Sequence, residues 1–277
     1  MLALAIPIGL LIGLSLGALG GGGSILTVPA LVYLLGQDTR SATTGSLLIV
    51  GVTALAGLAA HAREGRVRVA QGLVFGVLGV AGSWVGSRLS ASVPPNVLLT
   101  AFSALMLVVA TVMYARSRGS RHTPADTATD AATGAVDVSQ TPVVSFAPLR
   151  IDRTRALRVL VTATAVGLLT GFFGVGGGFA VVPALVLALG FAMPVAVGTS
   201  LLVIAVNSAS ALLARAGQGM HLDWVLLGTF TLAAIVGSVL GGRVASRVPP
   251  RTLSRAFTVL LVLVALYTAA RSVPQLL

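Results

Sequence analysis

The chain has 277 residues, of which 56% are hydrophobic and 9% are charged, and its formal net charge is +11 at pH 7. A soluble domain carries about 25% charged residues, so this composition excludes that class and indicates a polytopic membrane protein. The sequence has no Cys, which excludes disulfides and thiolate chemistry. Every basic residue is Arg, and we expect this excess to orient the chain in a bilayer rather than to bind nucleic acid.

The first half contains four apolar segments, and no residue from Met1 to Gln37 is charged. A helix needs about 20 apolar residues to cross a bilayer, so each segment is long enough to do so. The beginning of the chain has no basic region, and we expect a membrane segment there rather than a signal peptide. The segments cover residues 3–36, 41–61, 67–87 and 96–114.

A polar region separates the two halves. Residues 116–155 are rich in Pro, Thr, Asp and Ala and contain few large apolar side chains, which is typical of a flexible linker. We therefore divide the chain into a first membrane repeat (1–115), a linker (116–155) and a second membrane repeat (156–277). The second repeat has apolar segments at residues 157–190, 195–214, 222–242 and 253–270.

The two halves repeat one sequence pattern. Residues 13–65 align with residues 167–219 without a gap, and 22 of the 53 aligned positions are identical. The shared core is a Gly-x-Gly-Gly run, beginning at Gly20 and at Gly174, followed by Val-Pro-Ala-Leu-Val. Two matching halves with an interrupted apolar segment in each indicate a transporter binding site.

The first segment of each half, 3–36 or 157–190, is too long for a single membrane span. Thirty-four helical residues would reach about 51 Å, against a hydrocarbon core of about 30 Å. Each glycine in a helix costs about 1 kcal/mol relative to Ala, so a cluster of glycines should break the helix. We predict two short helices joined by a glycine turn, as a hairpin or re-entrant pair, and an odd number of crossings per half.

The arginine distribution predicts the orientation of the halves. The loop after the second segment is arginine-rich in the first half only, and the loop after the third segment is arginine-rich in the second half only. After the second segment, the first half carries Arg63, Arg66 and Arg68, whereas the second half carries only Arg215. After the third segment, the second half carries Arg243, Arg247 and Arg251, whereas the first half carries only Arg88. The positive-inside rule then predicts two inverted repeats, with the linker in the cytoplasm and both termini on the other side.

Small residues recur at a spacing of four in the third segment of each half. This spacing allows two membrane helices to approach closely, so we expect packing seams there. The pairs are Gly72 and Gly76, Gly82 and Gly86, and Gly237 and Gly241.

The candidate site is made of uncharged polar groups. A glycine cluster that opens a helix exposes backbone N–H groups, which bind anions together with the helix dipole. Nearby hydroxyl and amide groups add hydrogen-bond donors without burying a charge. We predict a substrate-binding site formed by Gly22, Gly23, Ser24, Thr44, Ser46, Gly176, Gly177, Gly178, Thr199, Ser200 and Asn207.

Structural roles compete with this interpretation. A Ser or Thr hydroxyl in a helix often bonds the carbonyl at i−4, and Asn207 could instead form an interhelical hydrogen bond. His61 and Asp223 stand at segment ends, where we expect interfacial positions, so no side chain is placed to carry a proton within the membrane. The sequence has no metal-ligand pattern and no catalytic acid–base pair, and we expect neither a cofactor nor an enzyme.

The repeated motif points to a known family. The run Gly-x-Gly-Gly, Val-Pro-Ala-Leu, then Ala-x-x-x-Ser-Leu-Leu in both halves resembles the sulfite exporter TauE/SafE permeases, over about residues 3–114 and 157–270. The resemblance implies a multi-pass inner-membrane permease for a small sulfur-containing or organic anion such as sulfite, a sulfonate or sulfoacetate. The second copy replaces Gly21 and Ser24 by Val and Gly, so the two halves are not chemically equal.

These observations favour a secondary transporter that moves a small anion across the lipid bilayer by alternating access at the repeat interface. A homodimer is compatible with such a bundle. A passive anion channel on the same scaffold is the alternative, and the absence of an ionisable group within the segments favours it. An embedded enzyme and a non-transporting assembly partner are the remaining alternatives.

Overall fold

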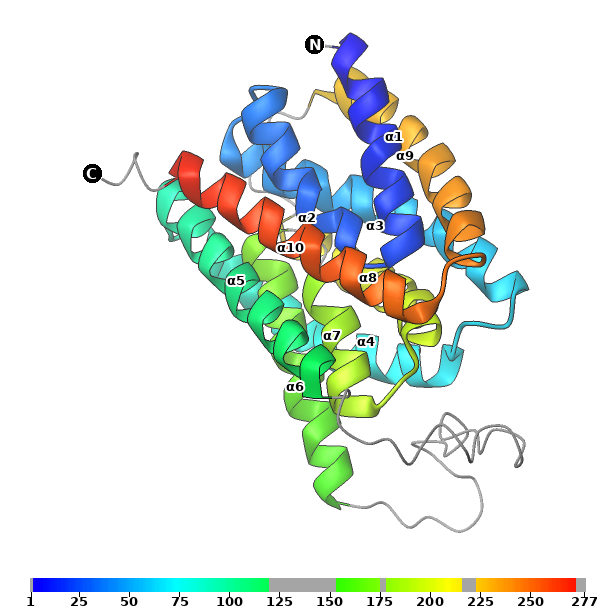
Figure 1. The fold of residues 1–277 in the computed structure, drawn as a ribbon. Coiled ribbons are helices and arrows are strands. Elements are labelled where there is room, and N and C mark those ends of the chain that lie inside the picture. Colours follow the sequence, from blue (N-terminus) through cyan, green and yellow to red (C-terminus); the bar gives the residue numbers. More distant parts are fainter. Residues whose placement is uncertain (1, 120–152, 175–177, 216–222, 273–277) are drawn as a thin grey trace.

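The computed structural model describes residues 2–119, 153–174, 178–215 and 223–272, and in these ranges all regular structure is helical (Figure 1). The all-α part of the expectation is therefore confirmed. The first half contains α1 (Leu2–Leu19), α2 (Gly22–Pro29), a short π-helix η1 (Ala30–Leu34), α3 (Thr39–Arg63), α4 (Val69–Ser90) and α5 (Pro95–Gly119). The second half contains α6 (Arg153–Phe173), α7 (Gly178–Leu189), α8 (Met193–Arg215), α9 (Trp224–Ala245) and α10 (Pro250–Ser272).

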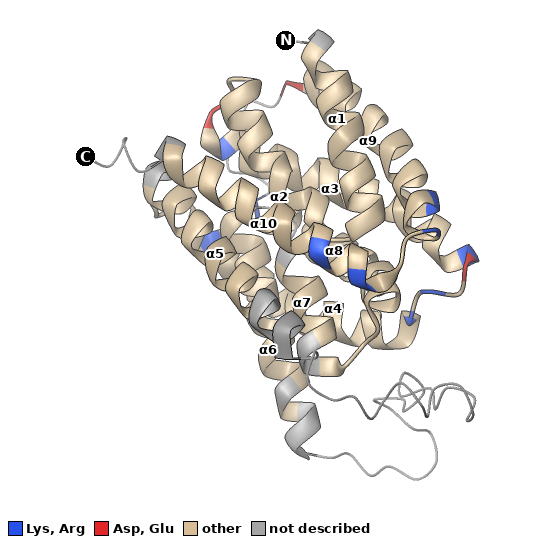
Figure 2. Ribbon diagram, viewed as in Figure 1, with Lys and Arg blue, Asp and Glu red and all other residues tan. Residues whose placement is uncertain are grey.

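Several of these helices are long and apolar enough to cross a membrane. Among the described residues five helices meet this condition: Thr39–Arg63, Val69–Ser90, Met193–Arg215, Trp224–Ala245 and Pro250–Ala270. Many large apolar side chains, such as Leu11, Val77 and Leu232, are exposed on the outside of the bundle, as expected for a surface that faces lipid. Charged residues lie mostly at helix ends and in loops (Figure 2). The protein is therefore a multi-pass membrane protein.

The glycine clusters divide the first segment of each half, as predicted. In the first half α1 ends at Leu19 and α2 begins at Gly22, and in the second half α6 ends at Phe173 and α7 begins at Gly178. Gly20 and Gly174 both have positive φ angles, of 63° and 65°. Only glycine adopts this conformation without strain, which explains why the turn carries glycine in both copies.

The two halves pack against each other in a reciprocal manner. The first helix of each half lies along the third long helix of the other: α1 along α9, and α6 along α4. The equivalent helices α3 and α8 contact each other, and so do α5 and α10 (Figure 1). Most of the interhelical contacts of the bundle are therefore contacts between halves.

Glycines make the α1–α9 and α4–α6 contacts possible. Gly13 and Gly17 of α1 lie against the backbone of Ala234 and Ser238, so that a Cβ at either glycine would collide with it. Gly82, Gly86, Gly237 and Gly241 make the same kind of close approach to the partner helix, which confirms that these spacings are packing seams. In a bilayer lipid tails are as apolar as Leu, so close van der Waals packing of this kind stabilises the bundle.

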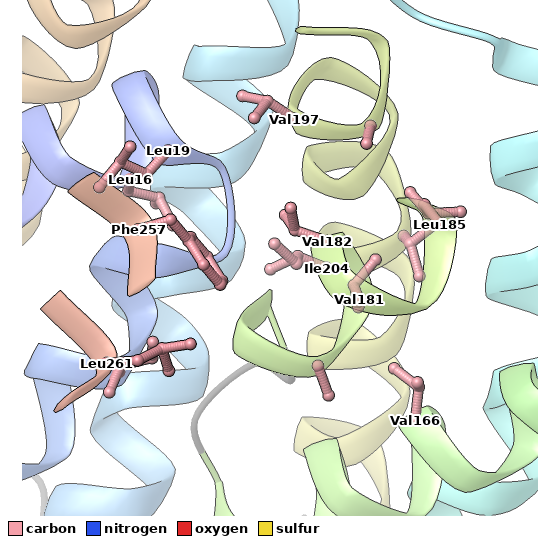
Figure 3. Packing of buried hydrophobic residues seen from close by; sticks show 14 of the residues in the cluster. Leu16, Leu19, Val166, Val181, Val182, Leu185, Val197, Ile204, Phe257 and Leu261 are labelled. Carbon is pink, nitrogen blue, oxygen red and sulfur yellow. The ribbon is translucent and has the colours of Figure 1, made fainter. Parts of the chain in front are cut away.

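The helices α3 and α8 run in opposite directions. Gly51 of α3 lies against Ser208 of α8, and Gly57 of α3 lies against Leu201 of α8. The contact thus moves six residues forward along α3 and seven residues backward along α8. The apolar core lies beside this pair, where α1, α2, α7, α8 and α10 meet (Figure 3). Leu16, Val182 and Phe257 are among the side chains fully buried there.

Candidate functional site

The glycine turns of the two halves meet each other in this core. A Cβ placed on Gly21 would collide with the backbone of Gly178, and a Cβ placed on Gly178 would collide with Gly21. The same Cβ on Gly178 would lie 2.9 Å from Ser24 Oγ and 2.7 Å from a methyl carbon of Ile204. The beginnings of α2 and α7 are thus in direct backbone contact, at the boundary between the halves.

Two predicted serines lie beside these turns, each next to the turn of the opposite half. Ser46 of α3 donates its hydroxyl to the carbonyl of Gly174 and lies 3.0 Å from the carbonyl oxygen of Thr43. Its repeat equivalent, Ser200 of α8, donates to Val197 O at 2.7 Å and lies against Gly20. The two serines therefore connect each half to the glycine turn of the other.

The remaining predicted residues of the first turn contact α1, α2 and α10. Ser24 Oγ donates to Gly21 O at 2.7 Å, within the first turn of α2. Gly23 faces the backbone of α1, and Gly22 faces the side chains of Leu19 and Phe257. Gly176 and Gly177, predicted as part of the same site, lie outside the described residues.

The predicted threonines contact other parts of the bundle. Thr199 Oγ1 accepts the backbone N–H of Arg68 at 3.1 Å, just before the first turn of α4. Thr44 Oγ1 accepts a hydrogen bond from the side chain of Arg215 at 3.1 Å. Both hydroxyls are thus hydrogen-bonded across the boundary between the halves.

Asn207 is fully buried in α8, and neither atom of its amide has a hydrogen-bond partner among the described residues. It lies against Gly79 of α4, where a Cβ would come within 2.8 Å of Asn207 Oδ1. A buried polar group without a partner costs about 1–3 kcal/mol, so Asn207 is a candidate for pairing with a ligand or an ordered water.

Arg215 is a functional candidate that sequence reasoning missed. The sequence places it in a loop, but in the structure it ends α8 and only 5% of its surface is exposed. Its Nη1 donates to Thr43 Oγ1 at 2.9 Å and to Thr44 Oγ1 at 3.1 Å, and its Nη2 donates to Gly171 O at 2.9 Å and to Ser90 Oγ at 3.4 Å. A cationic side chain is thus buried where α3, α4, α6 and α8 meet.

His61 occupies the equivalent position in the first half. It lies near the end of α3, as expected from the sequence, but its side chain is only 1% exposed. Its Nε2 lies 2.8 Å from Gly17 O, and its Nδ1 has no partner in the described part of the chain. Because a carbonyl oxygen can only accept, Nε2 carries the proton and Nδ1 holds a free lone pair.

A line of serines on α4 runs between Asn207 and Arg215. Ser83 Oγ donates to Ser210 Oγ at 3.0 Å, and Ser87 Oγ donates to Gly171 O at 3.3 Å. Together with Ser90 they form a polar seam, here defined as Ser83, Ser87 and Ser90 of α4 and the residues Asn207, Ser210 and Arg215 of α8. Within the described residues no group of three or more His, Asp or Glu side chains could hold a metal ion.

The repeat alignment carries a signal for Arg215 and His61. At the offset of 154 that aligns the two halves, position 61 falls on position 215, so both copies place a basic side chain at the end of an apolar run. Thr53 and Asn207 coincide in the same way, and both have buried side-chain atoms without a partner among the described residues. Equivalent polar positions in the internal repeat thus mark two pairs of buried polar side chains.

Comparisons with known proteins agree with this architecture. The family described as "Sulfite exporter TauE/SafE" matches residues 5–268. A "Probable membrane transporter protein" of Xylella fastidiosa (strain 9a5c) is 32% identical over 278 residues, which cover 98% of this chain and 96% of the relative. The "Probable membrane transporter protein YdhB" of Bacillus subtilis (strain 168) is 24% identical over 251 residues, 89% of this chain and 91% of the relative.

No solved structure matches the chain. The family match extends from the first turns of α1 to the last turns of α10, and so includes both glycine turns and the polar seam. The chain therefore belongs to the sulfite exporter TauE/SafE family of membrane transport proteins.

Proposed function

We propose that the protein is a secondary transporter of a small anion, of the sulfite, sulfonate or sulfoacetate class, that works by alternating access between its two halves in the inner membrane. The family match supports the transport function and the sulfur-containing class. The buried guanidinium of Arg215 supports an anion over a cation, since a cation would be repelled there.

Many alternating-access transporters are built from two inverted halves, and the helix contacts support this arrangement here. Repeat-equivalent helices α3 and α8 run in opposite directions, and α1 runs parallel to α9 while α6 runs parallel to α4. Gly45 lies against Leu227 and Gly57 against Ser238, so α9 runs parallel to α3. Gly72 lies against Leu202 and Gly76 against Val206, so α4 runs parallel to α8, and α1 and α6 therefore point in opposite directions. The swapped arginine-rich loops then lie on one side of the membrane, with the linker.

The observation that carries the proposal is the meeting of the two glycine turns. Gly21 and Gly178 are in contact at the boundary between the halves, where Ser46 bonds the carbonyl of Gly174 and Ser200 lies against Gly20. In inverted-repeat transporters the substrate site lies at such an interface, between discontinuous helices whose N-termini favour anions. A rocking movement of one half against the other would open the same junction to either side in turn.

A binding screen with a transport assay tests the proposal. Purified protein should melt at a higher temperature in the presence of its substrate, because a ligand that binds only the folded state stabilises it. We expect this shift with one or more of sulfite, methanesulfonate and sulfoacetate, and uptake of the same anion into proteoliposomes. Stabilisation and uptake with cations or neutral solutes only would contradict it.

A further inference from the structure

We propose that Arg215 binds the anionic group of the transported substrate, and that this group is an oxyanion with at least two oxygens. The inference rests on the proposed anion transport and adds to it a residue, a location and a substrate geometry. It is carried by the hydrogen bonds, the charge balance and the position of Arg215.

The hydrogen bonds of Arg215 leave one donor free. A guanidinium has five N–H donors in a fixed fork. Four of them can be assigned to Thr43, Thr44, Ser90 and Gly171. The fifth, on Nε, is buried and has no acceptor among the described residues. Nε and the adjacent Nη form the edge of the guanidinium that binds two oxygens of one acidic group.

The charge of Arg215 is also uncompensated within the described residues. Glu64 pairs with Arg66 at 3.1 Å. Asp38 accepts the backbone N–H of Ser41 at the start of α3, and Asp223 accepts two backbone N–H groups at the start of α9. These are the acidic residues that the structure describes, and each is engaged elsewhere. Buried charges are normally paired, so an anionic ligand is the expected partner of Arg215.

The acceptors around Arg215 are suited to exchange for a ligand. Three of the four, the hydroxyls of Thr43, Thr44 and Ser90, belong to the first half, and only Gly171 O belongs to the same half as Arg215. A movement of one half relative to the other changes the first three contacts and preserves the fourth. Substrate oxygens can then replace neutral hydroxyls as acceptors, forming stronger charge-assisted hydrogen bonds.

The geometry also restricts the substrate. A planar fork with a free Nε–H matches two oxygens of a sulfonate, sulfite or carboxylate group, whereas a halide offers a single centre. The equivalent residue of the first half is His61, which has no permanent charge. The guanidinium of the oxyanion site is therefore supplied by the second half only.

The alternative is a structural role, in which Arg215 only joins the two halves. Two substitutions separate these roles, with Arg243→Gln as the control, because Arg243 is exposed on α9 and its loss changes the net charge equally. Arg215→Gln removes the charge and the fork. Arg215→Lys keeps the charge but replaces the fork by a single ammonium, and so retains a folded protein if the charge is needed for folding.

The measurement is the affinity of each purified protein for sulfite, methanesulfonate and chloride at constant ionic strength, by calorimetry and by the shift in melting temperature. We expect the Arg215→Gln protein to bind the oxyanion about 10- to 150-fold more weakly, as for the loss of a hydrogen bond to a charged group. Arg215→Lys should also lose affinity for the oxyanion, with no loss for chloride, and Arg243→Gln should match the wild type.

Wild-type oxyanion affinity in both Arg215 variants would overturn the site and leave the proposed transport function intact. A lower melting temperature with unchanged affinity would assign Arg215 a structural role, which also overturns the site. Absence of any anion binding or uptake by the wild-type protein would instead overturn the proposed function, and the inference with it.

Discussion

His61 and Arg215 stand at equivalent positions of the two halves, and each lies within hydrogen-bond distance of the carbonyl oxygen of an equivalent glycine. His61 Nε2 is 2.8 Å from Gly17 O, and Arg215 Nη2 is 2.9 Å from Gly171 O. The second half thus has a permanently charged Arg215 at this position, whereas the first half has His61, which is charged only when protonated. This difference gives the two halves different electrostatic properties on an otherwise repeated scaffold.

The first prediction concerns the effect of pH on transport through His61. Protonation of the free Nδ1 of His61 would add a positive charge to the first half. The charged residues near His61 are Glu64 and Arg66 in the following loop, and its side chain packs against Gly17 and Gly242. We expect uptake of a sulfonate, which stays anionic throughout, to increase as the pH falls. In the His61→Gln protein this increase should be absent.

The measurement is the initial rate of sulfonate uptake into proteoliposomes from about pH 4 to pH 8, a range that extends below the usual protonation of imidazole because His61 is buried. Asp223→Asn is the control, because Asp223 lies exposed at the start of α9. Equal pH profiles for the wild type and His61→Gln would show that His61 has no part in the response.

The second prediction concerns Asn207. Replacing it with Ala should weaken substrate binding by about 1–3 kcal/mol if the amide pairs with the substrate. The melting temperature without substrate should not fall, because the amide has no partner among the described residues to lose. Ser103→Ala is a suitable control, since Ser103 is also buried but donates its hydroxyl to Leu99 O within its own helix. A lower melting temperature with unchanged affinity would indicate a structural role for Asn207.

The third prediction concerns the contact between the glycine turns. A Cβ on Gly178 would collide with Gly21, so Gly178→Ala should separate the turns and abolish or strongly reduce transport. The stability cost of such overpacking is about 1–3 kcal/mol, which should leave the protein inserted and folded. The matched variant is Gly228→Ala in α9, where nothing lies within 4 Å of the added carbon and transport should be unchanged. A folded Gly178→Ala protein with the native transport rate would exclude a role for this contact.

Much of this fold was predictable from the sequence because the determining features are local. The apolar segments predict membrane helices, and the glycine clusters predict a break that Gly20 and Gly174 make with positive φ angles. The glycine spacings of the third segments predict packing seams, since absence of a side chain allows close approach whatever the partner.

The candidate site was less predictable because many hydrogen-bond partners of its residues come from the other half. Arg215 follows an apolar run, as a loop arginine would, and its burial depends on Thr43, Thr44 and Ser90, more than 120 residues away in the chain. The burial of Asn207 followed from its apolar neighbours, but its position against Gly79 did not. Whether the predicted residues bind substrate remains a prediction for the experiments above.

The fourth prediction concerns the orientation of the chain. If the halves are inverted and each makes an odd number of crossings, the linker and the two termini lie on opposite sides of the membrane. The arginine-rich loops then predict that the side of the linker is the cytoplasm. A reporter active in the cytoplasm should therefore work when fused at Ala128, and a reporter active outside it should work when fused at Leu277. Finding both positions on the same side would contradict the inverted arrangement.

The most direct test of the central claim, alternating access to an anion site, is counterflow in proteoliposomes. Vesicles containing the protein are loaded with unlabelled substrate anion and diluted into labelled anion, with no other gradient. An alternating-access transporter must return its site to the outer face, so the internal anion should drive a transient accumulation of label above its external concentration. A passive channel equilibrates the label without overshoot, and that result would contradict the account.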